Sequence, residues 1–457
     1  MQLFFIIFFC LCLFFPVLHL LHCLPWFRET DERQLAAPGG RTGISIIIPS
    51  YNEAGIIRTS IQSMTALDAE TAEVLYIDDG SRDDTFMLLN EELGLHICEK
   101  KALGSLPHQP VEAVYRSSLH PNIYVIQKRN GGKADALNAG IEYAAEEVVV
   151  TLDADTVLTP EALPIINNKF SDPDVVAAGG MVHVLQTKTA SPLRKLTLAG
   201  TSMLLRVQML DFLKAFYVTK LSLARFQALA IISGAFGIFR KDALLDVGGY
   251  RSSVGEDIDI TLKIHRYIGR QKNKKVLLLT EAISYTELPE TWKDLFKQRI
   301  RWQKSYMDCL VHFRTFFART LVTKAVSFFY IIESLVVGIL AAYVTAGFFV
   351  ANAFLNMAFV FVGFIVVYMS YIFVFNFIYN MLALRQVNHY GFTFSKGDRL
   401  RLLATIVFDV FVHRFITMYF VMYGSIAYFF NKDWKKVSRT GNHYDLQAAP
   451  TESRKKY

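Results

Sequence analysis

The chain has 457 residues, of which 52% are hydrophobic and 19% charged, and 37 of them are phenylalanine. This composition is too apolar for a purely soluble protein and too charged for a bundle of membrane spans alone, so we expect a soluble domain joined to membrane helices. The net charge of +7 is modest, and no run of Arg and Lys alternates with aromatic residues, which argues against a nucleic-acid partner.

Residues 1–26 are predicted to form an N-terminal transmembrane anchor. They are almost entirely Phe, Leu, Ile, Val and Cys, and they can cross a hydrocarbon layer of about 30 Å. A cleaved signal peptide is the alternative, but no basic residue precedes the apolar run, as a signal peptide would require. Arg28, Arg33 and Arg41 follow the run, so the positive-inside rule predicts that the linker 27–43 and the domain after it are cytoplasmic.

Residues 44–290 alternate predicted strands with predicted helices, which favours an α/β domain with a parallel sheet between helices. Four predicted strands are "ISIIIPS", "EVLYIDDGS", "IYVIQKRN" and "EVVVTLDAD", and each of these runs ends in polar or turn residues. Ligands of such sheets bind at the carboxyl ends of the strands. The stretch from Glu92 to Pro121 carries Gly104, Pro107 and Pro110 and is predicted to be an irregular inserted loop.

Asp153 and Asp155 follow the last of these strands and can converge on one cation. Carboxylate oxygens, together with substrate phosphates, are the usual ligands of Mg²⁺ or Mn²⁺. Two acids in a turn are common without a metal, but Asp78 and Asp79 end an earlier strand of the same sheet and strengthen the pattern. The sequence therefore predicts a divalent cation at Asp153 and Asp155.

Two further stretches carry candidate binding or catalytic groups. In "NGGKADALNAG", Gly131 and Gly132 precede Lys133 at the start of a predicted helix, which suits an anion, although a plain turn and helix cap is the alternative. In "SSVGEDIDITLKIHR", Glu256 and Asp257 precede an amphipathic helix. Such acids are usually helix caps, but a carboxylate there also suits a general base.

Residues 291–320, with "FKQRIRWQKS", are predicted to form an interface-helix region, residues 321–431 the C-terminal transmembrane helices, and residues 432–457 a basic tail. The predicted spans are about Ala325–Val350, Ala353–Leu382 and Leu402–Phe430. Asp409, His413 and Arg414 interrupt the last of them, so an interfacial helix followed by a short span is the alternative there. The stretch 191–217 has apolar residues at helical spacing, so it predicts a helix that packs in the domain or lies in the headgroup plane.

Together these segments resemble the membrane-bound family 2 glycosyltransferases with the GT-A fold. Within that family the resemblance is strongest to the processive poly-β-1,6-N-acetylglucosamine synthases of bacterial biofilm systems. The matching segments, in order, are "PSYNE", "IDDGS", "NGGKADALNAG", "LDADT", "SGAFGIFRKDAL", "GEDIDITLKI", "LPETWKDLFKQRIRW" and "WKKVSRTG".

The resemblance implies roles for residues at the matching positions. Asp257 and Glu256 would be the catalytic residues, with Asp257 acting as the base. Trp302 of the Q-x-x-R-W motif would lie under the acceptor sugar. Asp153 and Asp155 would hold Mg²⁺ or Mn²⁺. The nucleotide-sugar donor would be bound by Ser50, Glu53, Asp78, Asp79, Lys133, Asp153, Gln298 and Arg301.

The implied activity is inverting, processive polymerisation from a UDP-sugar, most like UDP-GlcNAc to poly-β-1,6-GlcNAc, with translocation of the polymer. The implied partners are the UDP-sugar donor, the growing polysaccharide acceptor, membrane lipid and a small accessory membrane subunit, with no nucleic acid. The protein would lie in the inner or plasma membrane with a cytoplasmic catalytic domain. The alternatives are a hyaluronan-, chitin- or β-glucan-type synthase, a non-processive transferase with a lipid acceptor, and a transporter or receptor that only binds nucleotides.

Glu333 lies within the first predicted C-terminal span. An acid in that position usually faces a bundle interior or a water-filled path. Under the resemblance it would line the polymer channel; the alternatives are a shallow position in the membrane interface and a stabilising pair with Arg414 or His413.

Overall fold

The computed structural model describes residues 2–23, 42–67, 72–187, 195–271, 273–354 and 358–431. The chain divides into two compact units. The helical unit comprises Met1–Asp31, Leu196–Ala228 and Pro289–Val437, and the sheet unit comprises Glu32–Lys195, Leu229–Leu288 and Ser438–Tyr457.

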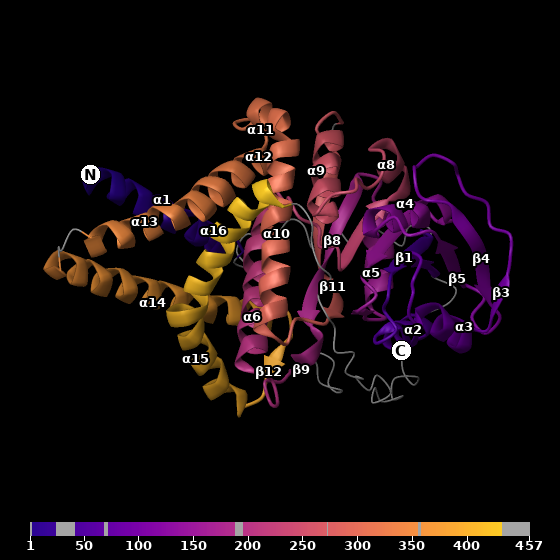
Figure 1. Cartoon of the computed structure of the whole chain (residues 1–457), viewed down its shortest axis with the longest axis horizontal. Coiled ribbons are helices and arrows are strands. Elements are labelled where there is room, and N and C mark those ends of the chain that lie inside the picture. The colour runs from indigo at the N-terminus through magenta and orange to yellow at the C-terminus, as the bar shows by residue number, and fades with distance from the viewer. Residues whose placement is uncertain are drawn as a thin grey trace. The chain divides into compact units, whose positions relative to one another are not determined.

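The described strands of the sheet unit form a ten-stranded sheet in the order β3-β4-β5-β2-β1-β6-β10-β8-β11-β7 (Figure 1). The four predicted strands are confirmed as β1, β2, β5 and β6, which lie side by side and parallel. The sheet is mixed rather than parallel throughout, because β3, β4, β7 and β10 run antiparallel to their neighbours. The strands are β1 (Ile44–Ser50), β2 (Ala72–Asp78), β3 (Leu95–Ile97), β4 (Val111–Ser117), β5 (Ile123–Lys128), β6 (Val148–Leu152), β7 (Thr156–Leu158), β8 (Val175–Val184), β10 (Phe236–Arg240) and β11 (Lys275–Thr286).

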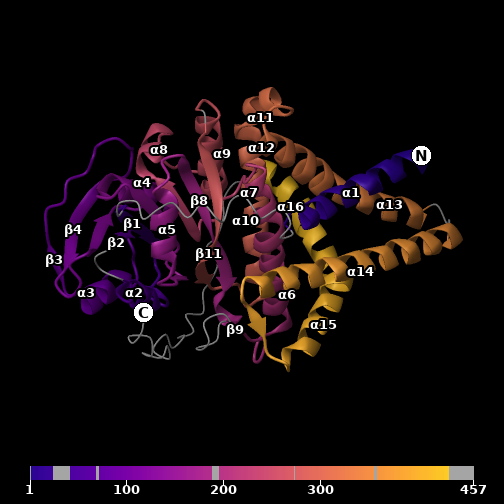
Figure 2. The same cartoon turned by 180° about the vertical axis from the view of Figure 1, so that it is seen from behind.

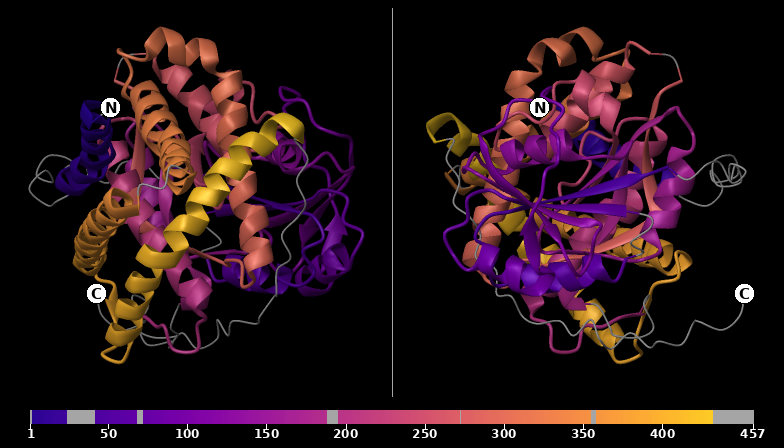
Figure 3. Two further views of the ribbon diagram at one scale, coloured as in Figure 1. Left: turned by 60° about the vertical axis from the view of Figure 1, so that its left-hand side comes forward. Right: turned by 90° about the vertical axis from the view of Figure 1, so that its right-hand side faces the viewer.

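Helices lie on both sides of the twisted sheet, as the right-hand view of Figure 3 shows. Because helix α4 packs on β1 and β2, a Cβ atom at Gly140 would lie 2.3 Å from Cγ2 of Ile47. The close approach of helix and strand therefore depends on glycine. The helices of this unit are α2 (Ile57–Thr65), α3 (Thr85–Leu93), α4 (Lys133–Tyr143), α5 (Ala162–Phe170), α8 (Lys241–Asp246) and α9 (Glu256–Ile268), with a 3-10 turn at Leu185–Thr187.

The segment 92–121, expected to be irregular, adds two strands to one edge of the sheet. "VEAVYRS" contains two valines and a tyrosine, residues that favour a strand, but the nearby Gly and Pro residues obscured this signal. The connection between the two strands is held by the buried carboxylate of Glu142, which accepts hydrogen bonds from the amides of Gly104, Ser105 and Leu106. Backbone groups of the loop are thus paired within the fold.

Among the described residues of the helical unit, two helices are long and apolar enough to cross a membrane: Ala325–Gly347, with mean hydropathy 2.1, and Asp398–Phe430, with mean hydropathy 1.5. They correspond to the first and third predicted C-terminal spans. Most of the second predicted span falls on α14, in whose first half the side chains lie outside the described residues. The elements are α1 (Gln2–Cys23), β9 (Lys195–Leu196), α6 (Met203–Lys214), α7 (Leu221–Arg225), α10 (Trp292–His312), α11 (Arg314–Thr320), α12 (Ala325–Phe328), α13 (Ala341–Phe354), α14 (Ala358–His389), β12 (Thr393–Phe394), α15 (Asp398–Phe408) and α16 (Arg414–Phe430), with π-helical stretches at Ala215–Lys220, Phe329–Leu340 and Asp409–His413.

The predicted helix over 191–217 begins only at Met203. Gly200 has a φ of 73°, which an α-helix does not allow, so the helix cannot extend back through this residue. The side chain of Ser202 accepts a hydrogen bond from the amide of Leu205. Ser202 is thus an N-cap that fixes the start of α6.

Glu333 is paired, but with neither of the two partners expected. Its carboxylate lies 2.9 Å from Nε2 of His19, whose Nδ1 lies 2.9 Å from the hydroxyl of Ser222. The chain of contacts joins the N-terminal helix α1 to α7 and to the π-helical stretch Phe329–Leu340 (Figure 2).

Candidate active site

The carboxyl ends of the central strands meet at one edge of the sheet, as their parallel register requires. Ser50 at the end of β1 is in register with Asp78 at the end of β2, which is in register with Gln127 of β5. Asp153 follows β6, the other neighbour of β1. The register of the sheet therefore brings the predicted polar residues together at this edge.

The loops after β1 and β2 are joined by hydrogen bonds. The amide of Asn52 donates to the hydroxyl of Ser81 at 3.0 Å, and the amide of Glu53 donates to the hydroxyl of Thr85 at 2.8 Å. Asn52 itself has a φ of 53°, in the left-handed region that Asn tolerates better than most residues. The two loops thus form one surface that carries Glu53 beside the end of β2.

The anion at the Gly131–Gly132 turn is a side chain of the protein itself. The amides of Gly131 and Gly132 donate to the carboxylate of Asp79 at 3.0 and 2.8 Å. The ammonium of Lys128, which is fully buried, pairs with Asp79 and also with Asp135. Gly132 has a φ of 88°, so only glycine makes this turn without strain. Asp79 therefore holds the turn from which α4 begins.

Asp78 differs from Asp79 in its contacts. Its Oδ1 accepts a hydrogen bond from the amide of Ser81 at 3.0 Å, whereas its buried Oδ2 has no hydrogen-bond partner in the described part of the chain. Burial raises the pKa of Asp78, and the hydrogen bonds from Ser81 oppose that rise. A buried acceptor with a vacant position suits a donor group on a ligand, so these contacts favour Asp78 over Asp79 for donor binding.

Lys133, the first residue of α4, joins two acidic segments that are far apart in the sequence. Its ammonium lies 2.7 Å from Asp153 and 2.8 Å from Glu256. Burial opposes the charge of Lys133, but the two carboxylates outweigh it, so the pKa of Lys133 lies above its ordinary value. The side chain is thus a fixed cation at physiological pH, and its 28% exposure leaves it accessible to a ligand.

Glu256 and Asp257 form the first turn of α9, where the helix dipole favours negative charge. Oδ1 of Asp257 accepts a hydrogen bond from the amide of Ile258 at 2.8 Å. Both interactions stabilise the ionised carboxylate, which is the form that a base requires.

The orientation of α9 depends on Asp259, which the sequence analysis did not single out. This carboxylate is fully buried, and it accepts from Nε of Arg251 at 2.7 Å. The segment before α9 is also held by a reciprocal pair, in which the side chain of Asn138 accepts from the amide of Tyr250 and donates to its carbonyl. The signal in the sequence was an acid between two isoleucines, a place where an acid needs a buried partner.

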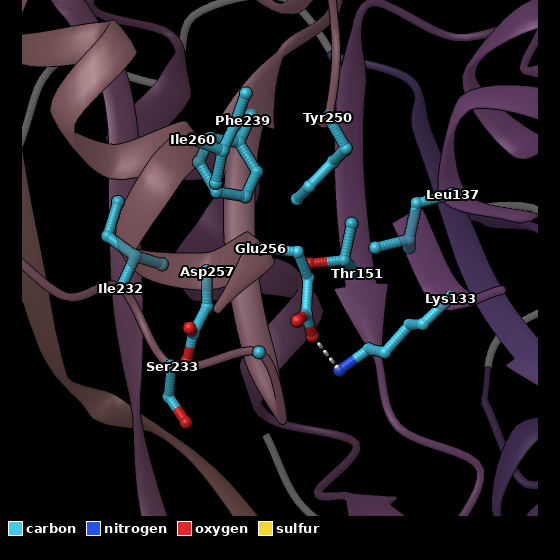
Figure 4. A pocket seen from close by; sticks show the side chains of 11 residues that line it. Lys133, Leu137, Thr151, Ile232, Ser233, Phe239, Tyr250, Glu256, Asp257 and Ile260 are labelled. Atoms are coloured by element: carbon cyan, nitrogen blue, oxygen red, sulfur yellow. Dashed lines mark ion pairs between the residues drawn. The ribbon is translucent and has the colours of Figure 1, made fainter. Parts of the chain in front are cut away.

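A narrow pocket lies where these elements meet (Figure 4). Figure 4 shows Lys133 and Glu256 reaching toward each other across it. Gly234 borders it, and a Cβ atom there would lie 3.0 Å from Nζ of Lys133 and 3.6 Å from Cβ of Asp257. The pocket is lined by Lys133, Leu137, Thr151, Ile232, Ser233, Gly234, Phe239, Tyr250, Glu256, Asp257 and Ile260. Gly234 is a second site residue that the sequence analysis did not assign, although its stretch "SGAFG" was among the matching segments.

Comparison with known families identifies this domain. Residues 45–100 match the family model described as glycosyl transferase family 2, and residues 108–305 match the model described as glycosyltransferase like family 2. The chain belongs to glycosyltransferase family 2.

Relatives and a solved structure agree with this assignment. The poly-β-1,6-N-acetyl-D-glucosamine synthases of Staphylococcus aureus (strain MSSA476) and Staphylococcus epidermidis are 28% identical over 305 residues and 27% identical over 304 residues. Each alignment covers 66% of this chain and 63% of the relative, so the match spans less than two thirds of the relatives' length. A mannosyltransferase from Pyrobaculum calidifontis, solved with GDP-mannose and Mn²⁺, superimposes with a TM-score of 0.53 at 16% identity, over 94% of this chain and 98% of that one. The predicted GT-A fold is confirmed.

The glycosyltransferase site has oxygen donors suited to a divalent cation. Asp155 is only 3% exposed, and a buried carboxylate requires a counter-charge or hydrogen-bond donors. Asp153 already faces one cation, the ammonium of Lys133. The pair of carboxylates at the end of β6 therefore fits Mg²⁺ or Mn²⁺ in its chemistry.

A second group of possible metal ligands lies in the helical unit. One carboxylate oxygen each of Asp211 and Asp409 and a ring nitrogen of His413 lie within 4.8 Å of one another. The ammonium of Lys214 already lies 2.8 Å from Asp409 and 3.4 Å from Asp211. This group contains neither Asp153 nor Asp155, the predicted metal ligands, and we interpret it as an ion-pair network.

Gln298, Arg301 and Trp302 lie on α10 of the helical unit, in the second and third turns of that helix. Trp302 is 38% exposed. The structure therefore assigns the predicted donor- and acceptor-binding residues to both units of the chain: the acids and Lys133 to the sheet unit, and the Q-x-x-R-W residues to the helical unit.

The contacts of Asp79 and Asp78 predict different defects. Replacing Asp79 with Ala leaves buried Lys128 with one carboxylate fewer and frees the glycine turn, so we expect a loss of about 3–5 kcal/mol of stability. The measurement is the thermal unfolding midpoint of the purified protein in detergent. Asp78→Asn is the matched control: its midpoint should stay close to that of the unmodified protein while donor affinity falls. An unchanged midpoint for Asp79→Ala would contradict the structural role.

Proposed function

We propose that this protein is a membrane-embedded, inverting and processive glycosyltransferase that polymerises N-acetylglucosamine from UDP-GlcNAc into a β-1,6-linked chain and translocates the product. The observation that carries the proposal is the convergence of Asp153, Glu256 and the start of α9 on the single ammonium of Lys133. The choice of sugar and linkage rests on the likeness to the staphylococcal synthases. The two apolar helices, long enough to cross a membrane, support a membrane location.

In the proposed reaction Asp257 takes the proton of an acceptor hydroxyl as the oxygen attacks the anomeric carbon of the donor. The new glycosidic bond forms while the bond from that carbon to the diphosphate oxygen breaks, so the configuration inverts. Asp257 lies in the first turn of α9, where the helix dipole favours the negative charge that a base carries. Glu256 holds Lys133 beside it.

The donor is proposed to lie along the edge of the sheet. Ser50, Glu53 and Asp78 would contact the uridine, the vacant oxygen of Asp78 accepting a hydrogen bond from the base. Lys133 would place its charge against the diphosphate, and by the family motif Gln298 and Arg301 would do the same. Arginine suits that role because its planar guanidinium binds phosphate oxygens with two hydrogen bonds.

Asp153 and Asp155 would hold the divalent cation, which when bound neutralises charge on the leaving diphosphate. Trp302 is proposed to stack against the terminal acceptor sugar, because the apolar face of a pyranose suits an indole ring.

The experiment that tests this function supplies purified protein in detergent with a panel of UDP-sugars and measures UDP release and polymer. We expect UDP release and polymer with UDP-GlcNAc, and digestion of that polymer by an enzyme specific for β-1,6-linked N-acetylglucosamine. Polymer from another UDP-sugar would favour a hyaluronan-, chitin- or glucan-type synthase, and a single transfer to lipid would favour a non-processive enzyme. Binding without any UDP release would contradict an enzyme altogether.

Removal of one cation ligand should nearly abolish transfer. For Asp155→Asn we expect a loss on the order of several kcal/mol of transition-state stabilisation, because the leaving diphosphate loses its counter-charge. UDP release is measured with Mg²⁺ or Mn²⁺ and in excess EDTA. Full turnover of the variant, or of the unmodified protein in EDTA, would show that these acids do not bind a required cation.

The base is tested by separating donor binding from transfer. Asp257→Asn should bind UDP-GlcNAc nearly as well as the unmodified protein while transfer falls by at least about 10²-fold, because only the proton acceptor is lost. Donor affinity is measured by calorimetry and transfer by UDP release. A variant with weaker donor binding and normal turnover would show that Asp257 acts only as a helix cap.

A further inference from the structure

The indole ring of Trp302 has a cation over one face. The guanidinium carbon of Arg299 lies 4.7 Å from the centre of the ring. The two residues are three apart on α10 and therefore share one side of the helix. The ring of Phe212 lies next to the indole, with centres 6.4 Å apart. Arg299 is not one of the three residues that define the Q-x-x-R-W motif, so the motif gives it no role.

Arg299 is itself held from a second helix. Its terminal nitrogen donates to Oδ2 of Asp211 on α6 at 3.2 Å, and the Arg299 side chain is only 16% exposed. Its Nε is buried and has no hydrogen-bond partner among the described residues. The plane of the guanidinium is therefore set by two neighbours, the carboxylate of Asp211 and the ring of Trp302.

Asp211 is in turn part of the ion-pair network described above. Lys214 joins it to Asp409, and Nδ1 of His413 lies 3.1 Å from Asp409. Asp409–His413 is a π-helical turn just before α16, and α16 packs along α10. Bulges of this type are frequent at functional sites. The network therefore connects α6, α10 and the helical stretch that continues into α16. Lys214 contacts Oδ1 of Asp211, whereas Arg299 contacts Oδ2.

We propose that Arg299 and Asp211 are positioning residues that hold the Trp302 ring at a fixed angle, so that its open face can receive the acceptor sugar. This inference rests on the proposed acceptor role of Trp302. Arg299 covers one face of the indole, and Trp302 remains 38% exposed, which leaves surface for contact with a sugar. A rigid ring costs less conformational entropy when a sugar binds than a ring that is free to rotate.

The first test compares acceptor and donor kinetics. Arg299→Met and Asp211→Asn should raise the KM for a short β-1,6-linked N-acetylglucosamine oligomer by about three- to tenfold, the scale of a lost cation–π contact, and leave the KM for UDP-GlcNAc unchanged. Arg299→Lys keeps the charge without the planar guanidinium and should fall in between. Lys293→Met, which removes an exposed cation from the first turn of the same helix, is the control and should behave like the unmodified protein. Equal changes in both KM values would overturn the proposal.

A double-mutant cycle tests whether Arg299 acts through the ring. In a Trp302→Leu background, Arg299→Met should have almost no further effect on the acceptor KM, because the ring it positions is gone. If the two effects simply multiply, Arg299 acts independently and the positioning role is wrong. If Trp302→Leu alone leaves the acceptor KM unchanged, the proposed acceptor role of Trp302 is wrong.

The position of the ring can also be measured without activity. The chain has four tryptophans, and replacing Trp26, Trp292 and Trp434 with Phe leaves Trp302 as the single fluorophore. Arg299→Met in this background should increase quenching by neutral acrylamide and lower the fluorescence anisotropy, whereas Lys293→Met should change neither. Unchanged quenching and anisotropy in Arg299→Met would overturn the inference even if the acceptor role of Trp302 holds.

Discussion

The candidate active site depends on one ion-paired cation, Lys133, between Asp153 and Glu256. Two carboxylates this close would repel each other and resist ionisation without a positive charge between them. The ammonium offsets that repulsion and joins the end of the central strand β6 to the start of α9. A ligand diphosphate can compete for the same ammonium, so the contact that organises the site also suits it to bind an anion.

Three further sets of polar contacts support the elements around Lys133, and two of them are directed at backbone groups. Asp79 binds the amides of the turn before α4, and Asn138 pairs with the backbone of Tyr250 ahead of α9. Asp259 pairs with Arg251 from within α9. These carboxylate and amide groups support the fold, whereas Asp78 and Lys133 lie at the strand ends where a ligand is proposed to bind.

In the helical unit, too, acidic side chains are paired with neighbouring polar or basic groups. Arg299 and Lys214 balance Asp211 and Asp409 in a region of apolar helices, where an unpaired charge would be costly, and His413 contacts Asp409. The His19–Glu333 contact likewise satisfies an acid within a predicted span. Such networks give specific positions to side chains that apolar packing alone would leave free to rotate.

Much of the fold and of the candidate site could be predicted from the sequence, because the signals are local. The alternation of strands and helices, the polar residues at the strand ends, the apolar runs at 325–347 and 398–430 and the family motifs are all patterns of neighbouring residues. These patterns were sufficient for the GT-A fold and the family. The tertiary structure decided which distant groups meet. The Gly131–Gly132 amides bind Asp79, and Lys133 joins Asp153 to Glu256. The segment 92–121 extends the sheet, and Arg299 lies over the ring of Trp302. The partners in the first two contacts lie far apart along the chain and are brought together by sheet register and helix packing. The last depends on a side-chain orientation that Asp211, on another helix, holds in place, and neither kind of contact leaves a local pattern in the sequence.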